Sequence, residues 1–378
     1  MSAYFAELSK ALKAAEIFRP CLVLDRDRLD ANIALVKQRL APGLAVRLVD
    51  KSLPCLPLLS HISKLLETGR FMTFHPPVTQ AVLDAFPAGD LLYGKPMPVG
   101  AAKAALARGD AGGWSRVCWL IDTPERLSEY GALAAAFGTE LRFAFEVDVG
   151  LHRGGFSGPA EIRALAIPKG LRCEGIMAYE AHAPEIPGLF GGAAGALKKA
   201  AAKAAEFVAA LDADQRRILN IGGSKTALLH DGGVANEVSI GSAFVLPSDF
   251  DTPGLDGFRP AALIATPILK ALDPVLPGPA AISRTLQALG LFPKKACYLY
   301  GGKWMAEPVF PAGMKPNGLI GLSSNQQFMG LPAGAEVKPG DYAFLRPTQS
   351  EAVLQHFGSL AVFAGGRIVE SWPVLPMG

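Results

Sequence analysis

The stretch RFAFEVDVG, residues 142–150, has the composition of a buried β-strand and ends in carboxylates and a glycine. It is one of eight short β-branched or aromatic runs between about residues 44 and 250, and alanine- and leucine-rich segments of helical spacing lie between them. The runs are AVRLVDK (45–51), RFMTFH (70–75), DLLYGK (90–95), SRVCWLID (115–122), RFAFEVDVG (142–150), RCEGIMAYE (172–180), RILNIGG (217–223) and NEVSIGSAF (236–244). Apolar strands that alternate with helices indicate a parallel sheet. Eight such units favour an α/β fold of the (β/α)8 TIM-barrel type over an open doubly wound sheet.

The chain changes character after about residue 250, where proline and glycine become frequent and helical spacing fades. The stretches KACYLYGG (295–302), KPGDYAFLRP (338–347) and LAVFAGGRIVESWPV (360–374) predict antiparallel strands, and AGG in the last is typical of a hairpin tip. We therefore predict two domains: a barrel over residues 26–250, and a β-rich domain formed by residues 1–25 together with 251–378.

Composition limits the function. Half of the residues are hydrophobic and the formal net charge is +3, which predicts an ordered chain and gives no indication of nucleic acid binding. The five cysteines are scattered and form no CxxC motif, which is typical of buried free thiols in a reducing compartment. The N-terminal stretch lacks the apolar block of a signal peptide, and no segment has the length of a membrane span. These features predict a cytoplasmic protein that acts on a small molecule.

Polar residues follow the predicted barrel strands, at the ends where the active sites of TIM barrels lie. They are Lys51, His75, Lys95, Asp122, Glu146, Asp148, His152, Arg153, Tyr179, His182, the Gly222-Gly223-Ser224 segment and the Gly241-Ser242 pair. A purely structural core would not need this concentration of polar groups at one rim.

The last two strands are each followed by glycine and serine, and in IGGSKTALL (221–229) a helix-like run comes next. Glycine lets the backbone approach an anion closely, and a helix start favours a phosphate. A plain tight turn explains either motif alone equally well, but both together, at units seven and eight, indicate a phosphate site. A lone Lys51 would be read as a snorkelling surface side chain. With a phosphate site present, Lys51 on strand one instead suggests pyridoxal 5′-phosphate (PLP), held as a Schiff base.

Several motifs occur in an order that resembles a known family. They are Lys51 after an apolar strand, FEVDVGLHRGGF (145–156), GIMAYEAHA (175–183), ILNIGGSKT (218–226), EVSIGSAF (237–244) and a β-rich C-terminal region. The whole resembles the fold-type III PLP enzymes, the alanine racemase-like superfamily, and within it the branch of D-threonine aldolase, D-serine dehydratase and D-3-hydroxyaspartate aldolase. The most specific part is VDVGLHRGG.

The resemblance implies a role for each matching residue. Lys51 would carry the Schiff base and act as the base on one face of Cα. Arg153 would lie against the cofactor or the substrate carboxylate, Tyr179 would contact the cofactor ring, and His182 would stand near the substrate. The phosphate would bind at Gly222, Gly223, Ser224, Gly241 and Ser242. The resemblance also implies a homodimer, in which the β-rich domain closes the active site.

One departure from the branch concerns its divalent metal site. The usual His-x-Cys or His-x-Asp ligands correspond here to Thr348 and Ser350, and a usual Glu-His-Gly corresponds to residues 325–328. Because neutral hydroxyls and amides are poor zinc ligands, we predict that this chain lacks the metal site. Glu351 and His356 are the residues that could rebuild one.

The expected activity is that of a PLP-dependent lyase on a D-amino acid with a β-hydroxyl, by aldol cleavage or dehydration. The alternatives are an amino-acid racemase and a non-catalytic PLP carrier, and the large C-terminal region disfavours the carrier. His75 and His182 are the candidate acid–base residues, with a helix-capping role as the alternative for His75. We expect Glu146 and Asp148 to orient Arg153 or Lys95, and the loop over residues 181–192 to act as a lid.

Overall fold

The computed structural model describes residues 2–109 and 111–376, which form two compact units. The barrel unit comprises Asn32–Phe244 and Phe250–Phe258, together with the last residues from Leu375. The β unit comprises the residues up to Ala31, Val245–Asp249 and Arg259–Val374.

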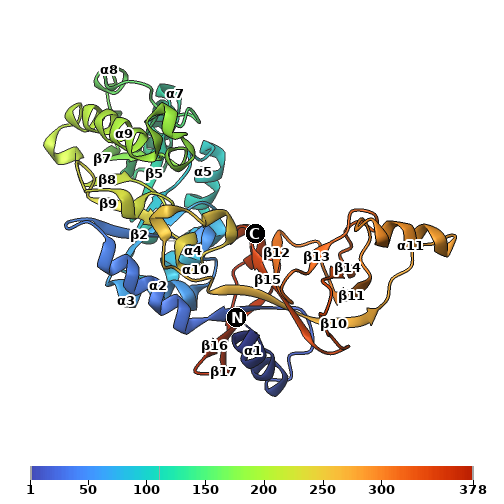
Figure 1. The fold of residues 1–378 in the computed structure, drawn as a ribbon. Helices are drawn as coiled ribbons and strands as arrows, with labels where there is room; N and C mark the ends of the chain where they lie inside the picture. Colours follow the sequence, from blue (N-terminus) through green and yellow to red (C-terminus); the bar gives the residue numbers. More distant parts are fainter. Residues whose placement is uncertain (1, 110, 377–378) are drawn as a thin grey trace. The chain divides into compact units, whose positions relative to one another are not determined.

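The barrel is closed and has eight parallel strands, as predicted (Figure 1). Its strands are β2 (Ala45–Val49), β3 (Arg70–Thr73), β4 (Asp90–Tyr93), β5 (Val117–Ile121), β6 (Leu141–Val147), β7 (Leu171–Ala178), β8 (Ile218–Ile221) and β9 (Glu237–Ile240). Each strand pairs with the next along the chain, and β9 returns to pair with β2, where Leu48 lies beside Ile240. All eight strand runs in the sequence are therefore confirmed.

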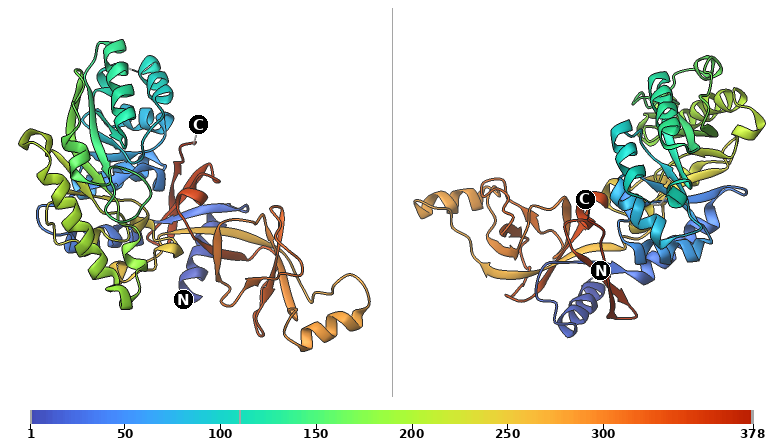
Figure 2. Two further views of the ribbon diagram at one scale, coloured as in Figure 1. Left: turned by 90° about the horizontal axis from the view of Figure 1, so that it is seen from above. Right: turned by 180° about the vertical axis from the view of Figure 1, so that it is seen from behind.

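Helices alternate with these strands. Along this part of the chain they are α2 (Arg26–Arg39), α3 (Leu56–Leu66), α4 (Pro76–Ala85), α5 (Val99–Arg108), α6 (Ala111–Trp114), α7 (Pro124–Phe137), α8 (Pro159–Arg163), α9 (Gly192–Ala209) and α10 (Ser242–Val245). Local signals explain α7: the Thr123 hydroxyl accepts the Arg126 N–H at 3.1 Å, and Gly138 ends the helix in the left-handed region. The long helix α9 packs against β7 (Figure 2).

One glycine allows two barrel strands to approach closely. Gly175 in β7 has a φ of +151°, and a Cβ there would lie 1.7 Å from the Ile218 carbonyl oxygen in β8. The β6–β7 register also shifts nearby, between Phe143 and Ala144. No larger residue fits at position 175 without moving β8.

The β unit contains a nine-stranded, mostly antiparallel sheet. Its strands are β1 (Cys21–Asp25), β10 (Ala262–Leu272), β11 (Lys295–Tyr300), β12 (Ala306–Phe310), β13 (Lys315–Pro316), β14 (Gln326–Leu331), β15 (Tyr342–Pro347), β16 (Ser359–Ala364) and β17 (Arg367–Pro373). The helices α1 (Ser2–Ala14), α11 (Ala280–Ala288) and α12 (Glu351–Leu354) accompany it. β16 and β17 form the predicted hairpin, and Gly365 and Gly366 at its tip both have positive φ.

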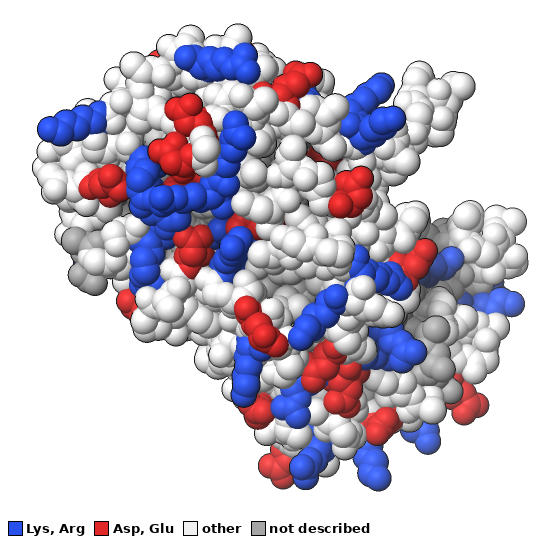
Figure 3. Space-filling model, turned by 90° about the vertical axis from the view of Figure 1, so that its left-hand side faces the viewer, with Lys and Arg blue, Asp and Glu red and all other residues white. Residues whose placement is uncertain are grey.

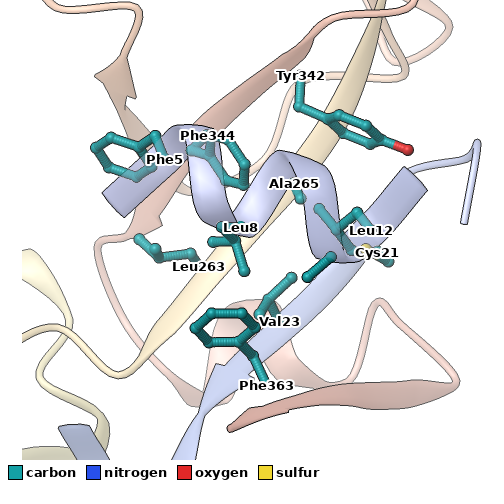
Figure 4. Close-up of a cluster of buried hydrophobic side chains, with 11 residues drawn as sticks. Phe5, Leu8, Leu12, Cys21, Val23, Leu263, Ala265, Tyr342, Phe344 and Phe363 are labelled. Atoms are coloured by element: carbon teal, nitrogen blue, oxygen red, sulfur yellow. The ribbon is translucent and has the colours of Figure 1, made fainter. Parts of the chain in front are cut away.

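The core of the β unit lies between α1 and the sheet (Figure 4). Leu8 and Leu12 of α1 are fully buried there, and the Phe5 ring stacks on Phe310 and Phe344 with 4.9 Å between centroids in each pair. The apolar face of α1 is thus covered by the sheet, which explains why the helical spacing near the N-terminus forms a stable helix.

All five cysteines are buried and free, as the sequence predicted. Lys and Arg side chains gather closely in one area of the face drawn in Figure 3, with Asp and Glu side chains among them. Within the described residues no helix has the length and apolar character needed to cross a membrane.

Candidate active site at the carboxyl ends of the barrel strands

Lys51 lies directly after β2, in a 3-10 turn, η1 (Asp50–Ser52), and is half-buried. Its Nζ is 4.9 Å from the centroid of the Phe74 ring, in the loop after β3. His75 precedes α4, but its side chain makes no capping hydrogen bond. Burial lowers the pKa of His75, and the charges of Lys95 and Lys51 lower it further. The neutral form of the His75 imidazole is therefore favoured, at a position near Lys51.

Asp50, immediately before Lys51, is fully buried. Neither carboxylate oxygen has a hydrogen-bond partner of good geometry among the described residues. Burial raises the pKa of Asp50 to about 7, although Thr73 and the amide and charge of Lys51 act to lower it. No role for this carboxyl group was predicted from the sequence.

The loops after β8 and β9 meet the loop that carries Lys51. A Cβ added at Gly241 would lie 2.9 Å from the Cβ atoms of both Val49 and Ser52, so only glycine allows this approach. The Ser224 hydroxyl accepts the Gly241 N–H at 3.0 Å, which joins the two glycine–serine loops. Ser242 is buried and begins α10. The predicted lysine and the two predicted phosphate loops are thus neighbours.

The prediction of a helix after Gly222-Gly223-Ser224 was wrong. The segment forms only a 3-10 turn, η5 (Ala227–Leu229). The reason is local: the Thr226 hydroxyl accepts the Gly223 N–H at 3.1 Å and closes a turn before an α-helix can begin. Anion binding at this loop would therefore depend on loop N–H groups and the Ser224 hydroxyl rather than on a helix dipole.

Tyr179 follows β7 and lies against the β8 loop. A Cβ added at Gly223 would be 2.5 Å from the Tyr179 Cε2 atom. The guanidinium carbon of Arg153, which is exposed, lies 5.4 Å from the centroid of the Tyr179 ring. The structure brings these two predicted residues together in a cation–π arrangement.

His182 precedes the 3-10 turn η2 (Ala183–Glu185) in the loop after β7. Its ring lies beside Gly150, where an added Cβ would be 3.3 Å from Nε2. The Nδ1 atom is buried and has no hydrogen-bond partner among the described residues. Such an imidazole nitrogen can accept or donate a proton on a bound molecule.

The prediction that Asp148 orients Arg153 or Lys95 was wrong. Asp148 accepts the backbone N–H of His152 at 3.0 Å and lies 2.8 Å from its Nδ1, instead of pairing with Arg153 or Lys95. The loop turns back at His152, which has a φ of +56°, and so brings its ring to the carboxylate. Burial raises the pKa of Glu146, and the Arg153 charge offsets part of this effect.

A buried pair at the same rim was missed. Glu180 Oε1 and His230 Nε2 are 2.9 Å apart, with side-chain exposures of 0% and 6%. A Cβ added at Gly222 would lie 2.9 Å from the same nitrogen, so the pair packs against the loop after β8. Glu180 ends one of the strand runs and could have been noted, but the 50 residues between the partners gave no signal for His230.

The residues at the branch's metal positions are engaged elsewhere. The Thr348 hydroxyl donates to the Met305 carbonyl at 3.1 Å, and the Ser350 hydroxyl lies 3.3 Å from the Glu351 carboxylate. His356 is exposed. Over residues 2–109 and 111–376, no three His, Cys, Asp or Glu side chains gather in a way that could hold a metal ion.

Comparison with known proteins shows which family the chain belongs to. The family model for the alanine racemase N-terminal domain matches residues 24–249, which is more than half of the chain. The chain belongs to the alanine racemase family. No curated protein matches the sequence.

Solved structures of similar fold cover nearly the whole chain. D-threonine aldolase from Filomicrobium marinum has a TM-score of 0.71 and 15% identity, over 94% of this chain and 96% of that one. D-threo-3-hydroxyaspartate dehydratase from Delftia sp. HT23 has a TM-score of 0.72 and 17% identity, over 94% and 97%. Alanine racemase from Bacillus anthracis has a TM-score of 0.69 and 14% identity, over 94% and 98%. At these identities the likeness establishes the shared fold.

Fold-type III enzymes of the alanine racemase family use PLP. The residues at this rim fit that cofactor. An amine, an aromatic ring and two glycine–serine loops come from adjacent strands, and the lack of a Cβ at Gly223 and Gly241 lets Tyr179 and the Lys51 loop approach them closely. These features supply groups for an aldehyde, a pyridine ring and a phosphate.

Proposed function

We propose that this member of the alanine racemase family is a PLP-dependent lyase for a D-amino acid with a β-hydroxyl, acting by aldol cleavage or dehydration. The observation that carries the proposal is the close approach of Gly241 to Val49 and Ser52, because it makes the loop of Lys51 a neighbour of the glycine–serine loops. The motif order and the fold shared with an aldolase and a dehydratase support the choice of reaction.

Each residue has a separate task. Lys51 would hold the cofactor aldehyde through its amine, and Tyr179 would contact the pyridine ring. Gly222, Gly223, Ser224, Gly241 and Ser242 would hold the phosphate. Bound PLP supplies an electron sink for the pair left at Cα when one of its bonds breaks. Arg153, beside Tyr179, binds the substrate carboxylate or the cofactor.

His182 is the acid–base group for the β-hydroxyl. In aldol cleavage its imidazole takes the hydroxyl proton, and in dehydration it protonates the departing hydroxyl. The buried Nδ1 atom lacks a partner within the described residues, so no protein contact competes with this role. The lowered pKa of His75 favours its neutral form, which makes it the second candidate for a base near Lys51.

We extend the proposal to a mechanism without a divalent ion, because Thr348 and Ser350 stand at the metal positions and hydroxyls are poor zinc ligands. Activity after exhaustive chelation with EDTA tests this extension. Unchanged turnover is expected, whereas loss of turnover that zinc or manganese restores would contradict it.

The direct test is attachment of the cofactor. The protein is mixed with PLP, reduced with borohydride and digested, and the peptides are weighed. A pyridoxyl group on Lys51 is expected, and Lys95→Ala serves as a matched control that keeps the modification. Absence of a modified Lys51 peptide from the folded protein would overturn the cofactor assignment.

The product distinguishes the reactions. D-threonine, D-threo-3-hydroxyaspartate, D-serine and both enantiomers of alanine are supplied separately. Glycine plus an aldehyde indicates cleavage, a keto acid plus ammonia indicates dehydration, and the opposite enantiomer indicates a racemase. The racemase remains the second candidate, because the family model and the fold are shared with alanine racemases.

The proposal includes a homodimer in the cytoplasm. Several apolar side chains around α11 are more than half exposed, as a surface for self-association would require. They are Val275, Ile282, Leu289, Leu291, Leu319 and Leu322. Light scattering after size exclusion should give about twice the 39.7 kDa chain mass, and the double variant Leu289→Glu/Leu291→Glu should give a monomer.

A further inference from the structure

The amino end of the barrel, opposite the proposed active site, contains a cavity of about 430 Å³. Six arginines and three acidic residues line it, a net charge of +3 in one cavity. The arginines are Arg47, Arg70, Arg116, Arg142, Arg172 and Arg217, and the acids are Asp90, Glu174 and Glu237. The volume is within the range of small-molecule sites, about 300–1,000 Å³.

The acidic groups are already bound to arginine. Glu237 is fully buried and accepts from Arg47 at 2.6 and 2.9 Å and from Arg70 at 2.9 Å. Asp90 accepts from Arg47 and from Arg142, each at 2.7 Å. Each carboxylate therefore serves two arginines, which leaves part of each guanidinium charge uncompensated.

Glu174 is shared among even more cations. It is 2% exposed and lies 3.2 Å from Arg142, 2.5 Å from Arg172 and 3.9 Å from Arg217. The long Arg217 contact and its 61% exposed side chain leave its guanidinium available to a ligand. Arg70 and Arg172 are 41% and 38% exposed and border the same cavity.

Arg116 adds a positive charge that no described carboxylate approaches within 4 Å. Its guanidinium instead donates to the carbonyls of Leu83, Phe86 and Gly89 at 2.8–3.0 Å. Three fixed acceptors hold the group rigidly without neutralising it. Such pre-organised guanidinium groups suit phosphate and carboxylate groups, which they bind through two parallel hydrogen bonds.

We propose that this arginine cavity binds a small oxyanion with at least two negative charges, a diphosphate or a polycarboxylate, as a second site of the protein. The ligand balances the excess charge of Arg116 and Arg217, with Arg172 beside them; Arg172 also pairs with the surface carboxylate of Glu140 at 2.7 Å, outside the cavity lining. The site is separate from the proposed cofactor site, because its residues lie at the amino ends of the strands whose carboxyl ends carry Lys51 and the glycine–serine loops.

The test is calorimetric titration of the PLP-treated protein at constant ionic strength. Sodium pyrophosphate and citrate are the two probes, and inorganic phosphate and sodium chloride are the comparisons. Saturable binding of pyrophosphate or citrate, tighter than that of inorganic phosphate, is expected, and the tighter of the two probes identifies the source as diphosphate or polycarboxylate. Heat no larger than with sodium chloride would overturn the proposal.

Three variants locate the binding. Arg172→Gln/Arg217→Gln removes two exposed cations and should raise Kd about tenfold or more. Ser115→Asp, at an exposed position of the cavity wall, adds a negative charge without altering an arginine and should also weaken binding. Arg163→Gln, an exposed position on α8, is the control and should bind as the unaltered protein does.

Equal binding by all the variants would place the anion elsewhere and overturn the proposal. Lys51→Ala should keep the binding, so failure of the proposed enzyme function and failure of this site give different results. Circular dichroism of each variant confirms that the fold is intact.

Discussion

The amino end of the barrel pairs its carboxylates with arginine, whereas the carboxyl end leaves buried polar atoms without partners of good geometry among the described residues. Asp90, Glu174 and Glu237 each contact at least two arginines. At the other end, the oxygens of Asp50 and the Nδ1 atom of His182 have no hydrogen-bond partner of good geometry in the described part of the chain. Unpaired buried polar atoms cost stability, so a fold keeps them where a ligand or a reaction uses them.

The largest expected effect is a loss of turnover when Lys51, at the carboxyl end of the barrel, is replaced. Lys51→Ala should lower turnover of the D-amino acid at least about 10³-fold, because it removes the cofactor attachment and a base. The thermal midpoint of the cofactor-free protein should hardly change, since Lys51 is half-buried at a rim. Steady-state kinetics and calorimetry measure the two quantities, and Lys64→Ala on α3 is the control.

The next largest effect is a loss of stability when the arginine–carboxylate network at the amino end of the barrel is altered. Glu237→Gln leaves the buried guanidinium of Arg47 without its main counter-charge, and the free energy of unfolding should fall by about 3–5 kcal/mol. Urea titration measures it. Glu140→Gln, whose partner Arg172 is also a surface residue, should change stability by less than about 1 kcal/mol. Similar losses for both variants would mean that the buried network is no more important than a surface pair.

A smaller effect concerns His182. His182→Ala should lower turnover about 10²-fold and leave PLP attachment to Lys51 intact, because it removes the acid–base group and not the cofactor site. His152→Ala is the matched control, since that ring contacts Asp148 at the surface. If both variants kept full activity, the β-hydroxyl would have to be served by another group, with His75 as the first to test.

The smallest expected effect is pH-dependent. Folded Asp50 has a pKa of about 7, against an ordinary value of 3.8, so the folded state binds more protons between those values and loses stability as the pH rises through them. Asp50→Asn has no such titration. Its advantage in unfolding free energy should be smallest near pH 4 and grow as the pH rises to about 7, because only the carboxyl group must lose its proton in the buried site; burial of the amide adds an offset that is the same at every pH. Thermal midpoints of the two proteins from pH 4 to 8 measure it, and a constant difference would contradict it.

The sequence could predict the elements that local patterns encode. Each barrel strand is a short apolar run, so all eight were found, and Lys51 was placed at a rim because it ends the first of them. The arginines of the amino end were equally visible, since Arg70, Arg142, Arg172 and Arg217 each stand at the beginning of a run. Their role was not predicted, because the active sites of TIM barrels lie at the opposite ends of the strands.

Other features could not be predicted, because they depend on how the chain returns in space. Glu180 and His230 meet only through loops after neighbouring strands, and His152 meets Asp148 only because the backbone adopts a left-handed conformation there. The helix expected after Gly223 failed for the opposite reason: one hydroxyl, that of Thr226, formed a competing turn.

The five buried thiols give the protein a built-in set of chemical reporters. Cys55, Cys118 and Cys173 lie in the barrel unit, and Cys21 and Cys297 lie in the β unit, all shielded from an alkylating reagent while the chain is folded. A short pulse of iodoacetamide in increasing urea, followed by peptide mass analysis, would therefore show which unit opens first. No engineered residue would be needed to follow the two units of the molecule separately.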